Sequence, residues 1–113
     1  MATLFTKIIN REIPAKIVYE NEKVLAFQDI NPQAPHHILI VPKLEISTIN
    51  DLTPENASLV GELFLAAKEI AKQLGVSERG YRVVMNCNQD AGQTVFHLHL
   101  HFLAGRELHW PPG

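Results

Sequence analysis

Hydrophobic residues in the first part of this 113-residue chain change from helical to strand-like spacing. Apolar residues three and four positions apart predict a short helix over 4–10, with Thr3 as its N-cap. Two β-rich runs, 17–20 and 23–27, follow with two residues between them and predict a hairpin. The next run, 37–41, is apolar at every position after the first, as expected for a central strand with both faces covered.

A longer amphipathic segment in the middle of the chain predicts the main helix. Thr53 as N-cap and Pro54 at the first helical position mark its start, and Gly75 is placed to cap its end. Between them, apolar residues at helical spacing predict one face packed on a sheet: Leu59, Val60, Leu63, Phe64, Ala67, Ile70, Ala71 and Leu74. A fourth strand is expected over 81–86.

The most unusual pattern lies near the C-terminus, where three histidines alternate with two leucines. Alternate side chains of a strand share a face, so His97, His99 and His101 would project together. A helix would scatter the same three side chains around its surface. The opposite face of the strand would enter the core and would carry Phe96, Leu98, Leu100 and Phe102. The pattern predicts a strand with a row of imidazoles on one face, which indicates a functional cluster.

Length and composition bound the kinds of protein that the chain can be. A chain of 113 residues that is 46% hydrophobic and 19% charged predicts a single globular domain over 1–113. Its formal charge of −2 and scattered basic residues argue against a nucleic-acid partner. No apolar run approaches the roughly 20 residues of a membrane span, and the N-terminus lacks the order of a signal peptide. The single cysteine, Cys87, fits a reducing compartment, so we expect a cytoplasmic protein without a membrane partner.

Three imidazoles on one face suit nucleophilic catalysis at phosphorus. A neutral imidazole attacks well, and the central His99 would have support from both neighbours. A flanking histidine in its protonated form would stabilise the phosphate oxygens. Directly upstream, residues 92–94 offer backbone N–H groups, the Gln93 amide and the Thr94 hydroxyl to an anion. The remaining substrate would meet an apolar surface made by Phe5, Ile8 and Phe27.

The residues alone leave two other interpretations open. His-x-His on a strand is also a zinc-ligand spacing, and a third ligand from His37 or Asp29 would complete an open catalytic site. Alternatively, the chain is a non-catalytic nucleotide- or protein-binding module whose interaction surface is the tail with Trp110. Asp29, which precedes the central strand, is either a turn-former or a hydroxyl acceptor.

Several further motifs make the chain resemble a known family. Residues 97–103 have the pattern His-φ-His-φ-His-φ-φ, where φ is apolar. The motifs that accompany it are Phe5 and Ile8, residues 13–16 (Ile-Pro-Ala-Lys), 29–37 (Asp-Ile-Asn-Pro-Gln-Ala-Pro-His-His), 92–94 (Gly-Gln-Thr) and 110–113 (Trp-Pro-Pro-Gly). On these residues, which span nearly the whole chain, the sequence strongly resembles the Hint branch of the histidine triad (HIT) family.

The resemblance implies a fold, an assembly and an activity. The fold would be α+β, with a five-stranded antiparallel sheet, one long and one short helix, and two subunits joined into a ten-stranded sheet. The activity would be hydrolysis of the P–N bond of purine nucleoside 5′-phosphoramidates, in which AMP or GMP is linked to an amine. No cofactor would be required, although zinc could bind the histidines adventitiously. The tail, 106–113, would pack at the site of the partner subunit.

The resemblance also assigns roles to individual residues. His99 would attack the α-phosphorus and form a nucleotidyl-histidine intermediate, His101 would contact the phosphate, and His37 and His97 would orient and polarise His99. Asp29 would accept the ribose hydroxyls beside Ile30. The other expected substrate-binding residues are Phe5, Ile8 and Phe27 in an adenine pocket, Asn86, Gly92, Gln93 and Thr94 around the phosphate and leaving group, and Trp110 from the other subunit.

One contrast within the superfamily favours hydrolysis. Nucleotidyl-transferase relatives carry Gln where this chain has His101, so a dinucleoside polyphosphate hydrolase or a transferase is the alternative rather than the main expectation. The chain departs from eukaryotic members of the branch at Thr94, where they commonly have Ser, and at Cys87, which we expect to be a buried or half-buried free thiol.

Overall fold

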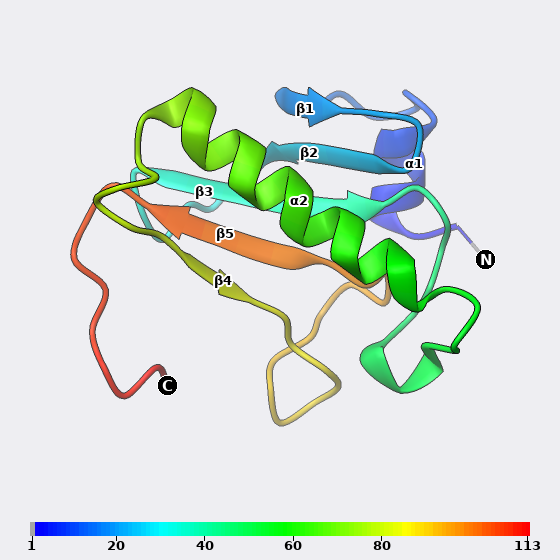
Figure 1. Cartoon of the computed structure of the whole chain (residues 1–113). Coiled ribbons are helices and arrows are strands. Elements are labelled where there is room, and N and C mark those ends of the chain that lie inside the picture. The colour runs from blue at the N-terminus through cyan, green and yellow to red at the C-terminus, as the bar shows by residue number, and fades with distance from the viewer. Residues whose placement is uncertain (1) are drawn as a thin grey trace.

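The computed structural model describes residues 2–113, which form a five-stranded antiparallel sheet with one long and one short helix (Figure 1). The strands lie in the order β1-β2-β3-β5-β4. The elements, in chain order, are α1 (Leu4–Ile9), β1 (Ile17–Glu20), β2 (Val24–Gln28), β3 (His36–Pro42), a 3₁₀ turn (Ile49–Asp51), α2 (Ala57–Leu74), β4 (Arg82–Val84) and β5 (Leu100–Ala104). This arrangement confirms the α+β fold class, the short helix and the hairpin.

The two helices cover opposite faces of the sheet. The long helix α2 lies across one face of the sheet (Figure 1). Its buried side chains pack on alternate residues of the central strands. On the other face, Phe5 and Ile8 of α1 pack against Leu25, Phe27 and Leu39. Period-two alternation along β2 and β3 sends neighbouring side chains to different cores, which is why both strands are apolar throughout. The candidate site develops beside α1, on the face that α2 leaves free.

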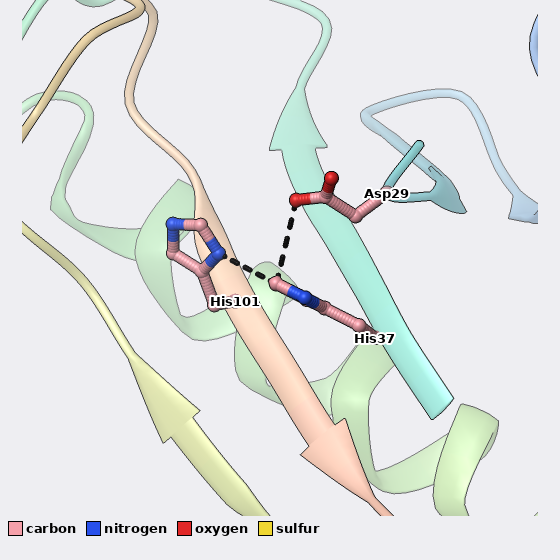
Figure 2. A group of neighbouring side chains, drawn as sticks. All are labelled: Asp29, His37 and His101. Carbon is pink, nitrogen blue, oxygen red and sulfur yellow. Dashed lines mark hydrogen bonds and ion pairs between the residues drawn. The ribbon is translucent and has the colours of Figure 1, made fainter. Parts of the chain in front are cut away.

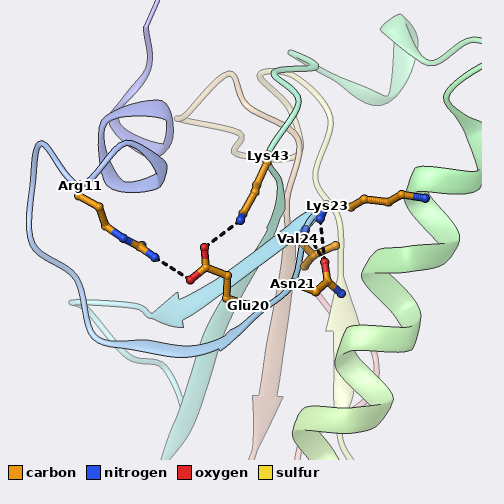
Figure 3. A network of polar contacts seen from close by, with 6 residues as sticks. All are labelled: Arg11, Glu20, Asn21, Lys23, Val24 and Lys43. Carbon is orange, nitrogen blue, oxygen red and sulfur yellow. Dashed lines mark hydrogen bonds and ion pairs between the residues drawn. The ribbon is translucent and has the colours of Figure 1, made fainter.

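The hairpin of β1 and β2 closes on an asparagine turn. Oδ1 of Asn21 accepts hydrogen bonds from the main-chain N–H groups of Lys23 and Val24, both at 2.9 Å (Figure 3). Just before the turn, Glu20 pairs with Arg11 at 2.6 Å and Lys43 at 2.8 Å (Figure 3). The hydrogen bonds from Lys43 and then Arg11 lower the pKa of the Glu20 carboxyl. These side-chain hydrogen bonds explain how Asn21-Glu22 forms the hairpin turn, although Asn-Gly is the more common sequence at such turns.

The prediction for the start of the main helix is wrong by three residues. Thr53 and Asn56 form a separate turn, in which Thr53 N donates to Asn56 Oδ1 at 2.8 Å and Asn56 N donates to Thr53 O at 3.1 Å. The helix begins after this turn, at Ala57, so Thr53 is not its N-cap. The predicted end is confirmed, because Gly75 adopts the left-handed conformation with φ +72°.

The apolar stripe of α2 also differs from the prediction at two positions, because Ala66 is buried and Phe64 is not. Phe64 is 49% exposed, so it does not belong to the core-facing stripe. The buried residues follow strict i, i+3, i+4, i+7, i+8 spacing: Leu63, Ala66, Ala67, Ile70 and Ala71. Three alanines in this stripe keep α2 close to the sheet.

The histidine strand is shorter than predicted. Strand β5 begins only at Leu100, so His97 and His99 precede the strand and His101 lies within it. The segment before β5 is diverted because Leu98 N donates to the carbonyl of Ile46 at 2.6 Å. Leu98, Leu100 and Phe102 enter the core as expected, but Phe96 is 46% exposed, which corrects its assignment to the core. The fourth strand is likewise shorter, at Arg82–Val84.

Among the described residues, no helix combines the length and apolarity needed to cross a membrane.

Candidate active site

A cavity of about 380 Å³ opens between α1, the ends of β2 and β5 and the loop before the histidines. It gathers eleven of the residues predicted to bind substrate: Phe5, Ile8, Phe27, Asp29, Ile30, Asn86, Gly92, Gln93, Thr94, His99 and His101. The cavity is also lined by residues that were not predicted to bind substrate: Leu4, Ile13, Pro14, Ala15, Gln28, Leu39 and Val95. Leu39 could have been found, because period-two alternation places it on the sheet face shared by Leu25 and Phe27 across the β2–β3 register.

His99 is held with one nitrogen fixed and the other available. Its Nδ1 lies 2.6 Å from the carbonyl oxygen of His97. A carbonyl only accepts, so Nδ1 carries the proton and Nε2 keeps its lone pair. The ring stands edge-on to Phe5, with centroids 4.9 Å apart, and is 8% exposed. Burial lowers the pKa of His99, which keeps the imidazole neutral and nucleophilic at neutral pH.

His97 plays a different part from the one expected. Its side chain is fully buried, and its Nε2 donates to the carbonyl of Pro42 at 2.7 Å. Its Nδ1 lies 3.4 Å from the Thr3 hydroxyl. The His97 imidazole therefore does not reach His99; the main-chain carbonyl of His97 orients His99 instead. This contact depends on the backbone path, which residue type alone does not reveal.

His37 and His101 form a second ordered pair (Figure 2). The main-chain N–H of Gln33 donates to Nδ1 of His37 at 3.0 Å, so that nitrogen is an acceptor and Nε2 bears the proton. His37 Nε2 lies 2.9 Å from His101 Nδ1 and 3.4 Å from Asp29 Oδ2. His101 Nδ1 accepts, which leaves the His101 proton on Nε2. The structure thus places His37 against His101 rather than in hydrogen-bond contact with His99.

Burial, followed by the proximity of two other histidines, keeps His101 neutral. Desolvation, followed by the neighbouring His99 and His37, lowers the pKa of His101 to about 4. Burial also lowers the pKa values of His37 and His97, against the opposing effects of Asp29 and the Pro42 carbonyl respectively. The expectation of a protonated flanking histidine is wrong for the site without substrate. A neutral His101 still presents an N–H donor through Nε2.

Asp29 forms the turn considered for it, and its role as a hydroxyl acceptor stays a prediction. Its Oδ1 accepts from the main-chain N–H of Asn31 at 2.8 Å, which makes it a turn-former. Its Oδ2 approaches His37, and the carboxylate lines the cavity with its side chain 18% exposed. One oxygen therefore fixes the loop while the other stays available to a hydroxyl group.

The loop before the histidines is less open to an anion than predicted. The Gln93 side chain is buried: Oε1 accepts from Asn88 N at 2.9 Å, and Nε2 donates to the carbonyls of Ser47 and Val95. The main-chain N–H groups of Gly92 and Gln93 bond within the loop, so these donors and the Gln93 amide are already used. Thr94 is exposed on the cavity wall, and its hydroxyl remains the polar group of this loop best placed for a ligand.

The side chains best placed to hold a metal among residues 2–113 are Asp29, His37 and His101, whose ligand atoms lie within 4.8 Å of one another. Of the three alternating histidines only His101 belongs to this group, so neither predicted His-x-His pair is part of it. A metal on His37 Nε2 would need the proton on Nδ1, where the Gln33 N–H already donates. The donor set therefore fits a metal poorly in the tautomers that the hydrogen bonds impose.

The predicted contribution of the tail lies outside this cavity. Trp110 is 80% exposed and does not line the cavity of its own chain. Its expected place in the site of another subunit stays a prediction. Cys87 is a half-buried free thiol, as expected.

Comparison with known proteins places these features in context. The model of the HIT domain family matches residues 10–108. The chain is 54% identical over 111 residues to a HIT-like protein of Synechocystis, covering 98% of this chain and 96% of the relative. It is 51% identical over 106 residues to the purine nucleoside phosphoramidase of Escherichia coli K12, covering 94% and 89%.

Solved structures agree with this result. The crystal structure of a HIT family hydrolase from Legionella pneumophila Philadelphia 1 superposes with a TM-score of 0.96 at 50% identity, covering 99% of this chain and all of the other. A histidine triad protein from Clostridium difficile gives a TM-score of 0.91 at 46% identity, covering 93% and 91%.

Proposed function

The chain belongs to the HIT family, and on that premise we propose that it hydrolyses the P–N bond of purine nucleoside 5′-phosphoramidates. The observation that carries this proposal is the fixed tautomer of His99. The His97 carbonyl holds its Nδ1 proton, so the lone pair of Nε2 is available in a cavity large enough for a nucleotide. The half-identical relative from Escherichia coli is named for the same activity.

The reaction proceeds in two displacements at phosphorus. His99 Nε2 attacks the α-phosphorus, the P–N bond breaks, and the amine leaves with a proton taken from water. The resulting imidazolium is stabilised because its Nδ1–H donates to the His97 carbonyl. Water then attacks the same phosphorus, breaks the bond to His99, and releases AMP together with the proton borrowed in the first step. His101 Nε2–H donates to the phosphoryl oxygens, whose charge is largest in the transition states.

The nucleoside occupies the apolar side of the cavity. Phe5 and Phe27 meet edge to face at 5.4 Å and, with Ile8, form a wall suited to a purine ring. Asp29 Oδ2 accepts the ribose hydroxyls at the rim, beside the exposed Ile30. An apolar wall discriminates weakly between adenine and guanine, so both AMP and GMP derivatives are substrates in this proposal.

We also propose that two chains join through β4 into a ten-stranded sheet. β4 pairs with β5 on one side only, so its other edge is free among the described residues to add a strand. The exposed Phe64 of α2 and Tyr81 beside β4 supply apolar surface for such a contact. In the dimer, Trp110 packs at the partner's site and contacts the leaving amine.

A cytoplasmic location is proposed on the basis of the free thiol of Cys87.

The test is hydrolysis of an amine-linked AMP phosphoramidate after exhaustive removal of metals by chelation, with His99→Ala as the control. We expect full activity in the metal-free protein and none in the variant. Activity that disappears on chelation and returns with zinc would replace this mechanism with a metal-dependent one. No hydrolysis by the parent protein, together with AMP binding, would leave a nucleotide-binding module.

A further inference from the structure

The loop over residues 29–35 is joined to the start of the C-terminal tail at two adjacent points. The guanidinium Nε of Arg106 donates to the main-chain carbonyl of Gln33 at 3.0 Å. Next to it, Gly105 passes so close to Pro35 that a Cβ on residue 105 would lie 2.8 Å from Pro35 Cβ. Gly105 also has φ +97°, a conformation that favours glycine. The tail is therefore fixed to this loop both by packing and by a hydrogen bond.

Gln33 contacts the histidine pair through its other main-chain group. While its carbonyl accepts from Arg106, its N–H donates to Nδ1 of His37, a buried residue that is 6% exposed. That one donor decides the position of two protons: His37 carries its proton on Nε2, and His101 carries its proton on the nitrogen that faces away from His37. The position of the Gln33 N–H thus determines which nitrogen of His101 carries the proton, and His101 is the side chain expected to contact the phosphate.

We propose that Arg106 is a positioning residue, which holds Gln33 so that the Gln33 N–H orders the protons of His37 and His101. The inference rests on the proposed function for its kinetic consequences but not for its structural ones. Arg106 itself does not line the cavity, so it contacts neither the substrate nor the reacting atoms. Its Nη1 donates to the carbonyl of Glu107 at 2.9 Å, which fixes the guanidinium over the loop.

Loss of the contact would allow the proton order to reverse. Without a fixed donor at Nδ1, His37 is free to carry its proton there and to accept at Nε2. His101 Nδ1 must then donate, and its Nε2 presents a lone pair in place of an N–H. A lone pair repels the phosphoryl oxygens that the N–H would stabilise. The loss falls mainly on the transition state, in which these oxygens carry the most charge.

The direct test is ¹⁵N NMR of the imidazole nitrogens in the substrate-free protein. Arg106→Met removes the donors and keeps most of the aliphatic stem. In the parent protein, we expect His37 Nδ1 and His101 Nδ1 to be unprotonated and both Nε2 atoms to be protonated. In the variant, both rings should show averaged tautomers. Arg106→Lys should restore the parent pattern, because its ammonium is able to donate to the same carbonyl.

Kinetics provides the second readout. For Arg106→Met we expect kcat to fall about tenfold, the lower end of the range for outer partners of functional histidines, with KM changed less than about twofold. The matched control is Arg79→Met, which alters an arginine in the same surface hollow as Arg106. Arg79 makes no hydrogen bond to the 29–35 loop among the described residues, so its variant should match the parent in both readouts.

Each outcome decides the proposal. A folded Arg106→Met protein with parent-like ¹⁵N tautomers overturns it, whatever the rate. An equal change in Arg79→Met would indicate a general effect of surface charge and would also overturn it. If the parent protein hydrolyses no phosphoramidate, the proposed function fails, but the NMR comparison still decides whether Arg106 orders the histidine protons.

Discussion

Four histidines that look equivalent in the sequence do different things in the structure. His99 offers a lone pair, and His101 offers an N–H, because different groups hold their Nδ1 atoms. His37 transmits the order set by a backbone amide, and His97 is a buried structural residue whose carbonyl matters more than its ring. For each histidine, the ring nitrogen that carries the proton therefore determines whether the side chain can donate or accept at the cavity.

Replacing His99 should separate chemistry from binding. His99→Ala removes the nucleophile, so kcat should fall by at least roughly a thousandfold. The Phe5 and Phe27 wall and Asp29 remain, so AMP should bind with an affinity within about tenfold of the parent. Steady-state kinetics and titration calorimetry measure the two effects. Loss of both activity and binding would instead assign His99 a structural role.

The pH dependence of activity should reflect the lowered pKa of His99. Burial disfavours its imidazolium form, so the nucleophile stays neutral below the ordinary value of 6.5. The acidic limb of the kcat/KM profile should therefore have its midpoint below 6.5. A midpoint at or above 6.5 would mean that the free site does not hold His99 in its neutral form.

Stability should fall on acidification for the same reason. The folded chain holds His101 neutral down to a pKa of about 4, whereas the unfolded chain binds a proton near 6.5. The unfolded state thus gains protons first, and the free energy of unfolding decreases as the pH falls from about 6.5 towards 4. For this half-buried side chain, we expect a loss on the order of 1–2 kcal/mol. Urea unfolding of the parent and of His101→Asn should show a smaller decrease in the variant.

At the scale of elements, sequence patterns correctly predicted the helices and strands whose positions follow from the spacing of apolar residues. The alternating and helical spacings located the hairpin, the central β3 and the end of α2 at Gly75. They failed where a side chain bonds to nearby backbone instead of continuing a helix, as Asn56 does with Thr53. The start of β5 was also misplaced, because a tertiary bond from Leu98 to Ile46 diverts the chain and no local pattern encodes that partner.

Gly105, which directly follows β5, and Gly61, which lies within α2, should respond oppositely to the same change. Gly105→Ala would place a Cβ 2.8 Å from Pro35 and impose a positive φ, so it should cost about 2 kcal/mol or more. Gly61→Ala lies in α2 with open space around the new methyl group and should stabilise by about 0.5–1 kcal/mol. Urea midpoints give both values. A neutral Gly105→Ala would show that the tail is not held against the 29–35 loop.

At the scale of the whole molecule, the cavity was predicted far better than the hydrogen bonds within it. Residue types and their resemblance to a family brought together residues as distant in sequence as Phe5, Asp29 and His99. The role of Gln93 was missed, because its amide closes the loop through a hydrogen bond to the main-chain carbonyl of Ser47, 46 positions away. The resemblance to a family therefore predicted which residues line the cavity more reliably than which hydrogen bonds they form.

Assembly is the second property of the whole molecule that needs a test. If β4 extends the sheet across a dimer, scattering or sedimentation should give about twice the chain mass of 12.7 kDa. A monomer at assay concentration would contradict both the ten-stranded sheet and the contribution of Trp110 to a partner's site. In a dimer, Trp110→Ala should change KM or kcat for bulky amines more than for ammonia, as measured with a series of leaving groups.

The most direct test of the central claim is the stereochemical course at phosphorus. A phosphoramidate made chiral at phosphorus by sulfur substitution would be hydrolysed in isotopically labelled water, and the configuration of the product determined. Attack by His99 followed by attack by water inverts the centre twice, so we expect retention of configuration. Inversion would show that water attacks directly and that His99 never bonds to the nucleotide.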